Sequence, residues 1–216
     1  MKLTFATKLT SALIASYLIG SFPSGYLFFK AKTGRDIRNH GSRKNIGATN
    51  AFLEGGFWVG FLTLLFDLLK GLIPVLLSTI FFGGSDLTRE AVMILCGLSA
   101  VLGHIFPIYI GFKGGTGLST SAGAVIGIAP GIALPSILII LILTFITKRP
   151  AFMGLVLTLI LPFYSYYDNR SILITGMMSV MALVYFIISM THIKSMLRGD
   201  EYFEFSTKFK RIFQKK

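Results

Sequence analysis

Charged residues are scarce in this sequence, and acidic ones most of all. Charged residues make up 14% of the 216 residues, whereas a soluble domain carries roughly 25%. Only nine are Asp or Glu, against 21 Lys or Arg. Hydrophobic residues make up 53% and occur in long runs. This composition excludes an ordinary soluble domain and indicates a polytopic membrane protein.

Several residue patterns of well-known sites are also missing. Cys96 is the only cysteine, which excludes an intramolecular disulfide. The three histidines have no metal-ligand spacing, so we expect neither a metal nor a cofactor. The sequence has no G-x-S-x-G nucleophile elbow and no Walker A loop. These absences argue against the metalloenzyme, serine-hydrolase and P-loop classes.

The apolar runs predict an all-α fold, a membrane bundle of about seven transmembrane helices in a single domain over residues 1–216. A crossing helix needs about 20 apolar residues. Pro130, Gly131 and Pro135 split 118–147 into two helices, because proline interrupts a helix; the first is short and broken or buried against protein. The expected spans are 9–29, 57–82, 91–111, 118–129, 131–147, 151–166 and 171–191.

The charges of the loops predict the orientation. Residues 30–56 carry six Lys or Arg against two acidic residues, and 194–216 carry seven against three. Because basic loops stay in the cytoplasm, both segments face inward, which requires an odd number of spans and an outside N-terminus. The net charge of +12 then fits an anionic leaflet or an anionic substrate. We expect membrane lipids, and no nucleic acid, as partners.

The stretch "GFKGGTGLSTSAG" (111–123) is unusually rich in glycine for a loop between spans. The N–H groups of Gly114, Gly115 and Gly117, with Lys113, can form an anion site at the start of a helix near Leu118. The alternative is a tight turn in which the glycines only permit the backbone angles.

Three polar residues fall inside apolar runs. Asp67 and Lys70 share a helix face, since they are three residues apart, and an ion pair toward the bundle interior is the expected arrangement. His104 in "GHIFP" is more often a hydrogen-bonded core residue than a catalyst.

Four stretches together resemble a known family: "GSFPSGYLFFK…GRDIRNHGS…NIGATN", "FDLLKG", "GHIFPIYIGFKGG.G" and "LRGDE". The family is that of the bacterial acyl-phosphate-dependent glycerol-3-phosphate acyltransferases, the PlsY family. The resemblance implies a seven-helix bundle in the bacterial inner membrane. It also implies transfer of an acyl chain from acyl phosphate to the 1-hydroxyl of glycerol 3-phosphate, which gives lysophosphatidate. The resemblance further implies that the substrate's own phosphate acts as the base.

The resemblance also implies the site residues. It makes Ser42 catalytic, and the H-x-x-x-x-D pair of acyl-coenzyme-A-dependent acyltransferases is absent. The implied substrate-binding residues are Asn45, Gly47, Thr49, Asn50, His104, Lys113, Gly114, Gly115 and Gly117.

The sequence departs from the family pattern at several positions. The first motif is one residue longer, and Leu53 stands where an arginine is expected. Thr116 replaces the second lysine of "KGGKG". Near the C-terminus, Ser189, His192 and Ser195 stand at the expected histidine, asparagine and arginine. Arg43, Lys44 and His192 are the cations available to replace those that are missing.

Two functions are therefore compatible with the sequence. The first is an active acyltransferase with shifted cations, expected to be a monomer. The second is a degenerate member that binds a phospholipid or phosphate metabolite without turnover. A transporter has little support, because the sequence shows no repeat.

Overall fold

The structure is a computed structural model that describes residues 4–82, 84–168, 170–191 and 207. These residues form helices joined by short connections, as the composition predicts, and no strand is found among them. The elements in chain order are α1 (Phe5–Gly20), α2 (Ser24–Thr33), the short 3-10 helix η1 (Ile37–Asn39), α3 (Ala48–Gly55), α4 (Phe57–Phe81), α5 (Asp86–Ile105), the 3-10 helix η2 (Ile108–Ile110), α6 (Leu118–Ile128), α7 (Pro130–Thr147), α8 (Pro150–Tyr167) and α9 (Ile172–Met190).

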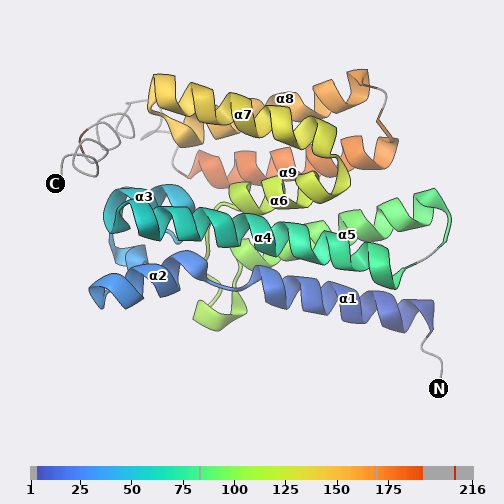
Figure 1. Cartoon of the computed structure of the whole chain (residues 1–216), viewed down its shortest axis with the longest axis horizontal. Helices are drawn as coiled ribbons and strands as arrows, with labels where there is room; N and C mark the ends of the chain where they lie inside the picture. Colours follow the sequence, from blue (N-terminus) through green and yellow to red (C-terminus); the bar gives the residue numbers. More distant parts are fainter. Residues whose placement is uncertain (1–3, 83, 169, 192–206, 208–216) are drawn as a thin grey trace.

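The helices lie roughly parallel to one long axis (Figure 1). Within the described residues, six helical segments are long and apolar enough to cross a membrane, with α1 and α2 counted as one segment. A further apolar helix, α6, has 11 residues and is too short to cross. The all-α membrane bundle is thus confirmed, whereas the number of about seven transmembrane helices and the orientation of the termini stay predictions.

The short α6 is buried against protein, as its length requires. A Cβ added at Gly71 of α4 would overlap the backbone oxygen of Thr120 in α6, and one added at Gly123 would overlap that of Leu68. Small residues let two membrane helices approach this closely. The chain then breaks at Ala129, and α7 begins at Pro130, where proline suits the first helical position.

Two elements differ from the sequence-based expectation. The predicted span 9–29 is not one helix, because α1 ends at Gly20 and α2 begins after Pro23. The basic segment 30–56, expected as a loop, contains η1 and the eight-residue α3. In Figure 1, α2, α3 and the turn between α7 and α8 lie at one end of the bundle, whereas α1 begins at the other.

Candidate active site

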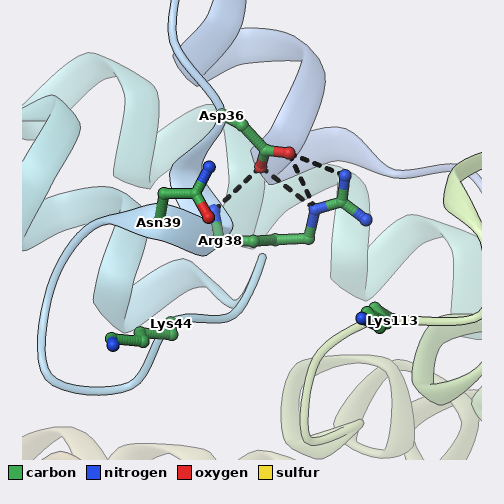
Figure 2. A pocket seen from close by; sticks show the side chains of 6 residues that line it. Asp36, Arg38, Asn39, Lys44 and Lys113 are labelled. Atoms are coloured by element: carbon green, nitrogen blue, oxygen red, sulfur yellow. Dashed lines mark hydrogen bonds and ion pairs between the residues drawn. The ribbon is translucent and has the colours of Figure 1, made fainter.

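A basic pocket lies at the end of the bundle where α2 and α3 are found. Its lining residues come from two connections, 36–44 and 113–114: Asp36, Arg38, Asn39, Lys44, Lys113 and Gly114. Figure 2 shows the paired Asp36 and Arg38 side chains on one side of this pocket, with Lys44 and Lys113 across from them on separate loops. Three cations against one carboxylate make this pocket suited to an anion.

The Asp36–Arg38 ion pair fixes the geometry of the basic pocket. Arg38 Nη2 lies 2.6 Å from Asp36 Oδ2, and Arg38 Nη1 donates to the carbonyl oxygen of Ile110 at 2.7 Å. Arg38 thus ties the first loop to the segment that leads into the glycine stretch. The hydrogen bond from Arg38 lowers the pKa of the Asp36 carboxyl below its ordinary value, so Asp36 is ionised at neutral pH.

The glycine stretch is held by backbone hydrogen bonds. The N–H of Gly114 donates to the carbonyl of Ile105 and that of Gly115 to the carbonyl of His104, both at 3.1 Å. These two N–H groups are therefore engaged and do not form the expected anion nest. Gly117 has a positive φ of 85° and precedes α6. Because the first intrahelical bond of α6 is donated by Ser121 to Gly117, the N–H groups of Leu118 and Ser119 have no helical acceptor.

A buried polar cluster lies directly behind the glycine stretch. Lys70 Nζ is 2.8 Å from Asp67 Oδ1, which confirms the predicted ion pair toward the bundle interior. Ser24 Oγ donates to the same carboxylate oxygen at 2.6 Å, and His104 Nδ1 lies 3.6 Å from it. A Cβ added at Gly115 would overlap the imidazole of His104. His104 is thus held between the Asp67 carboxylate and the backbone of Gly115.

A second, longer cavity starts beside the same loops and runs between the helices. Its volume is about 460 Å³, within the roughly 300–1,000 Å³ that is typical of ligand sites. One end is lined by polar residues of the loops and helix starts, among them Arg43, Asn45, Thr49, Thr116 and Ser119. The rest is lined mainly by apolar side chains of α4, α6, α7, α8 and α9. Such a cavity suits an amphipathic ligand with one polar end.

The predicted site residues are distributed over both cavities. Asn45, Gly47, Thr49 and His104 line the long cavity, whereas Lys113 and Gly114 line the basic pocket. Four others, Ser42, Asn50, Gly115 and Gly117, are not among the lining residues of either. Their roles toward substrate stay predictions.

Two of those four have clear positions, Ser42 in the first loop and Asn50 in α3. Ser42 is exposed in the turn before Arg43. Asn50 is buried, and its Nδ2 donates to the backbone carbonyls of His40 and Asn45 at 3.2 and 2.8 Å. Asn50 therefore holds the loop 40–45 in place.

The departures from the family pattern also have definite places. Leu53 and Thr116 line the long cavity. Ser189 is 1% exposed, and its hydroxyl has no hydrogen-bond partner among the described residues. His192 and Ser195 lie outside the described residues. Arg38 was not predicted as a site residue. The sequence feature that could have indicated it is Asp36, an acidic residue two positions earlier in a basic loop.

The described residues contain no group of three His, Cys, Asp or Glu side chains that is able to hold a metal ion. The groups that the described part of the site offers include cations, hydroxyls, helix N-termini and the buried cluster around Asp67.

Comparison with known proteins identifies the family. The model of the glycerol-3-phosphate acyltransferases matches residues 10–199. The chain belongs to the glycerol-3-phosphate acyltransferase family. Among family members, the protein of that name from Syntrophomonas wolfei is 34% identical over 175 residues, which cover 80% of this chain and 86% of that one. The one from Desulfotalea psychrophila is 36% identical over 188 residues and covers 87% and 94%.

Solved structures of the family agree with the fold. The glycerol 3-phosphate form of PlsY, an integral membrane glycerol 3-phosphate acyltransferase, matches with a TM-score of 0.80 and 30% identity, over 89% of this chain and 93% of that one. Its lysophosphatidic acid form matches with a TM-score of 0.76 and 27% identity. The comparisons favour an acyltransferase over the degenerate, non-catalytic alternative.

Proposed function

We propose that this protein transfers an acyl group from acyl phosphate to the 1-hydroxyl of glycerol 3-phosphate. The products are 1-acylglycerol 3-phosphate and inorganic phosphate. One observation carries the proposal: the same two segments line both cavities. Residues 43 and 116 line the long cavity, whereas 44 and 113 line the basic pocket. A soluble phosphate and a lipid chain held in these cavities meet at the shared loops.

We assign the glycerol 3-phosphate phosphate to the basic pocket and the acyl chain to the long cavity. The PlsY structures named above are a glycerol 3-phosphate form and a lysophosphatidic acid form, which are ligands of these two chemical kinds. The ammonium groups of Lys44 and Lys113 have no ion-pair partner across the part of the chain that the structure describes. They are therefore available to a phosphate.

The reaction needs positioning and charge stabilisation rather than a covalent enzyme intermediate. The glycerol hydroxyl oxygen bonds to the acyl carbon, the carbon–oxygen bond to phosphate breaks, and phosphate leaves. The hydroxyl proton passes to a substrate phosphate oxygen. The N–H groups at the starts of α3 and α6 lie beside the polar end of the long cavity. Helix N-termini stabilise negative charge, so they favour the phosphate and the oxyanion that develops.

Turnover by the purified protein tests this function. With acyl phosphate and glycerol 3-phosphate in detergent, we expect phosphate release that depends on both substrates, together with lysophosphatidate. Ser42→Ala should reduce turnover while the folded amount stays the same. A folded wild-type protein that releases no phosphate with both substrates present contradicts the proposal. Acyl-coenzyme A serves as the matched donor control and should not react.

We place the site at the cytoplasmic face of the bacterial inner membrane, in a monomer. Support comes from the basic loops at the site end of the bundle and the positive-inside rule. Cys96 is 1% exposed, so this native cysteine should react little with a thiol reagent. An impermeant thiol reagent added from outside should label Ser85→Cys and Asp168→Cys but not His40→Cys. Labelling of His40→Cys from outside contradicts this orientation.

A further inference from the structure

The long cavity follows one face of α7 into the bundle. Its lining positions on α7 are 133, 136, 137, 140, 141 and 144. This spacing of three and four residues marks a single helix face. Since a helix rises 1.5 Å per residue, the cavity runs for roughly 17 Å along α7 and roughly 11 Å along α6, from Leu118 to Val125.

The inner end of this cavity is closed by the hydrophobic core. On four of the lining helices, the lining residue farthest from the basic loops belongs to the main core cluster or packs against it; these residues are Val125 of α6, Ala133 of α7, Leu161 of α8 and Met178 of α9. Ala133 and Met178 are only 3% and 2% exposed. A chain that enters from the loops therefore meets a wall of packed side chains.

Two hydroxyl groups of the inner wall are bonded within their own helices. Ser136 Oγ donates to the carbonyl of Ile132 at 2.7 Å, and Thr158 Oγ1 donates to that of Gly154 at 2.5 Å. Both hydroxyls are thus engaged by carbonyl oxygens of their own helices. The inner part of the cavity suits an unbranched alkyl chain.

The depth of the long cavity can be compared with the length of an extended alkyl chain. An extended alkyl chain advances roughly 1.25 Å per carbon, given a carbon–carbon bond of about 1.52 Å and a bond angle near 111°. These approximate depths correspond to roughly 8–13 carbons in line. We infer that the closed end, and Ala133 and Met178 in particular, sets which acyl-chain lengths the protein prefers. This inference rests on the proposed acyltransferase function.

Two substitutions at the closed end should shift the preference in opposite directions. Ala133→Leu fills the inner end and should favour shorter chains, whereas Met178→Ala deepens it and should favour longer ones. Each methylene that a hydrophobic pocket gains or rejects changes kcat/KM by about 10–200-fold. Leu134→Phe is the matched control, because Leu134 is 57% exposed beside Ala133 and the change adds the same number of carbon atoms as Ala133→Leu.

The assay measures kcat/KM for a series of saturated acyl phosphates that differ by two carbons. The readout is the ratio between a long and a short chain within one variant, which does not depend on the folded amount. We expect this ratio to fall at least about tenfold in Ala133→Leu, to rise in Met178→Ala and to stay unchanged in Leu134→Phe.

A length profile in Met178→Ala identical to that of wild type overturns the inference, whether or not Ala133→Leu folds. Absence of turnover by wild type at every chain length contradicts the proposed function instead. In that case, thermal stabilisation by lysophosphatidates of increasing length decides the inference. A stabilisation maximum that Met178→Ala moves to longer chains supports it, and an unmoved maximum overturns it.

Discussion

The two cavities share their loops yet are built in different ways. The basic pocket is lined by the connections 36–44 and 113–114, and its shape depends on the Asp36–Arg38 pair and the bond from Arg38 to Ile110. The long cavity is lined mainly by helix faces, and its shape depends on packing. A hydrated phosphate and an alkyl chain need these two different constructions, because one is recognised by charge and the other by shape.

The cavities meet where the glycine stretch lies against His104. Gly114 lines the basic pocket and Thr116 the long cavity, and Gly115 between them packs on the imidazole. The imidazole in turn lies beside Asp67, whose carboxylate is held by Lys70 and Ser24. The buried cluster therefore lies against the loop that lines both cavities, although it belongs to the membrane part of the fold.

The largest effect is expected from Gly115→Ala, which disturbs the contact between the glycine stretch and His104. The added methyl overlaps the imidazole of His104, so the loop that lines both cavities has to move. Because a displacement of about 1 Å can cost about 10²-fold in rate, we expect turnover to fall by roughly that factor. Steady-state kinetics with both substrates varied measures the effect.

The double variant Gly115→Ala/His104→Ala tests the cause. Removal of the imidazole makes room for the methyl, so the double variant should be no slower than His104→Ala alone. Such non-additivity is typical of residues in contact. Additive losses would show that Gly115 acts independently of His104.

Lys113→Met tests the assignment of the two cavities. Loss of a charge-assisted hydrogen bond costs about 1.5–3 kcal/mol, so KM for glycerol 3-phosphate should rise about 10–150-fold. KM for acyl phosphate should change little. Lys8→Met, at an exposed position of α1, is the control. A rise in KM for acyl phosphate alone would mean that the basic pocket holds the other substrate.

The helices of the bundle were predictable because their signals are long and local. Prolines and glycines near 130 indicated the short α6, and the spacing of Asp67 and Lys70 indicated their ion pair. The break between α1 and α2 was missed because the apolar run continues through Pro23. Helix α3 was missed because it has eight residues in a basic segment, and its start at Gly47 has no side-chain cap.

The candidate site was predictable in residue type but not in geometry. The family motifs pointed to Lys113 and His104, yet nothing local indicates that they lie on different cavities. Three glycines suggested an anion nest, whereas Gly114 and Gly115 give their N–H groups to Ile105 and His104. Those acceptors are the end of α5, and only the tertiary fold brings the glycine stretch back against them.

Thr116→Lys tests the effect of an added charge at the polar end of the long cavity. Its expected effect on activity is smaller than that of Lys113→Met. Thr116 lines the polar end of the long cavity, and a lysine there adds charge where a hydroxyl gives one neutral hydrogen bond. A charge-assisted contact is roughly twice as strong as a neutral one, so we expect phosphate binding or turnover to improve about three- to tenfold. Thr116→Met, without charge, should give no gain. Calorimetry in detergent and kinetics measure both variants; equal values for Lys and Met contradict a phosphate at this position.

The smallest expected effect concerns the Asp36–Arg38 pair and its pH dependence. The hydrogen bond from Arg38 lowers the pKa of Asp36, so the pair stabilises the folded state above the unfolded pKa, and this contribution is lost as pH falls through the lower, folded value. The side chains are 27% and 24% exposed, which limits the contribution to about 0.2–1 kcal/mol. Asp36→Asn should therefore be slightly less stable at pH 7, and the difference from wild type should shrink below about pH 3.9.

The matched control is Asp168→Asn, which removes a carboxylate with the same two-residue spacing from Arg170 Nε, 2.7 Å away. Thermal unfolding in detergent should show a similar small loss for both variants at pH 7. Only Asp36→Asn should also raise KM for glycerol 3-phosphate, by about 1.5–5-fold, because Arg38 then loses the partner that directs it between the first loop and Ile110. Equal KM values in the two variants would mean that this ion pair stabilises the loop without shaping the basic pocket, and that Lys44 and Lys113 hold the phosphate without it.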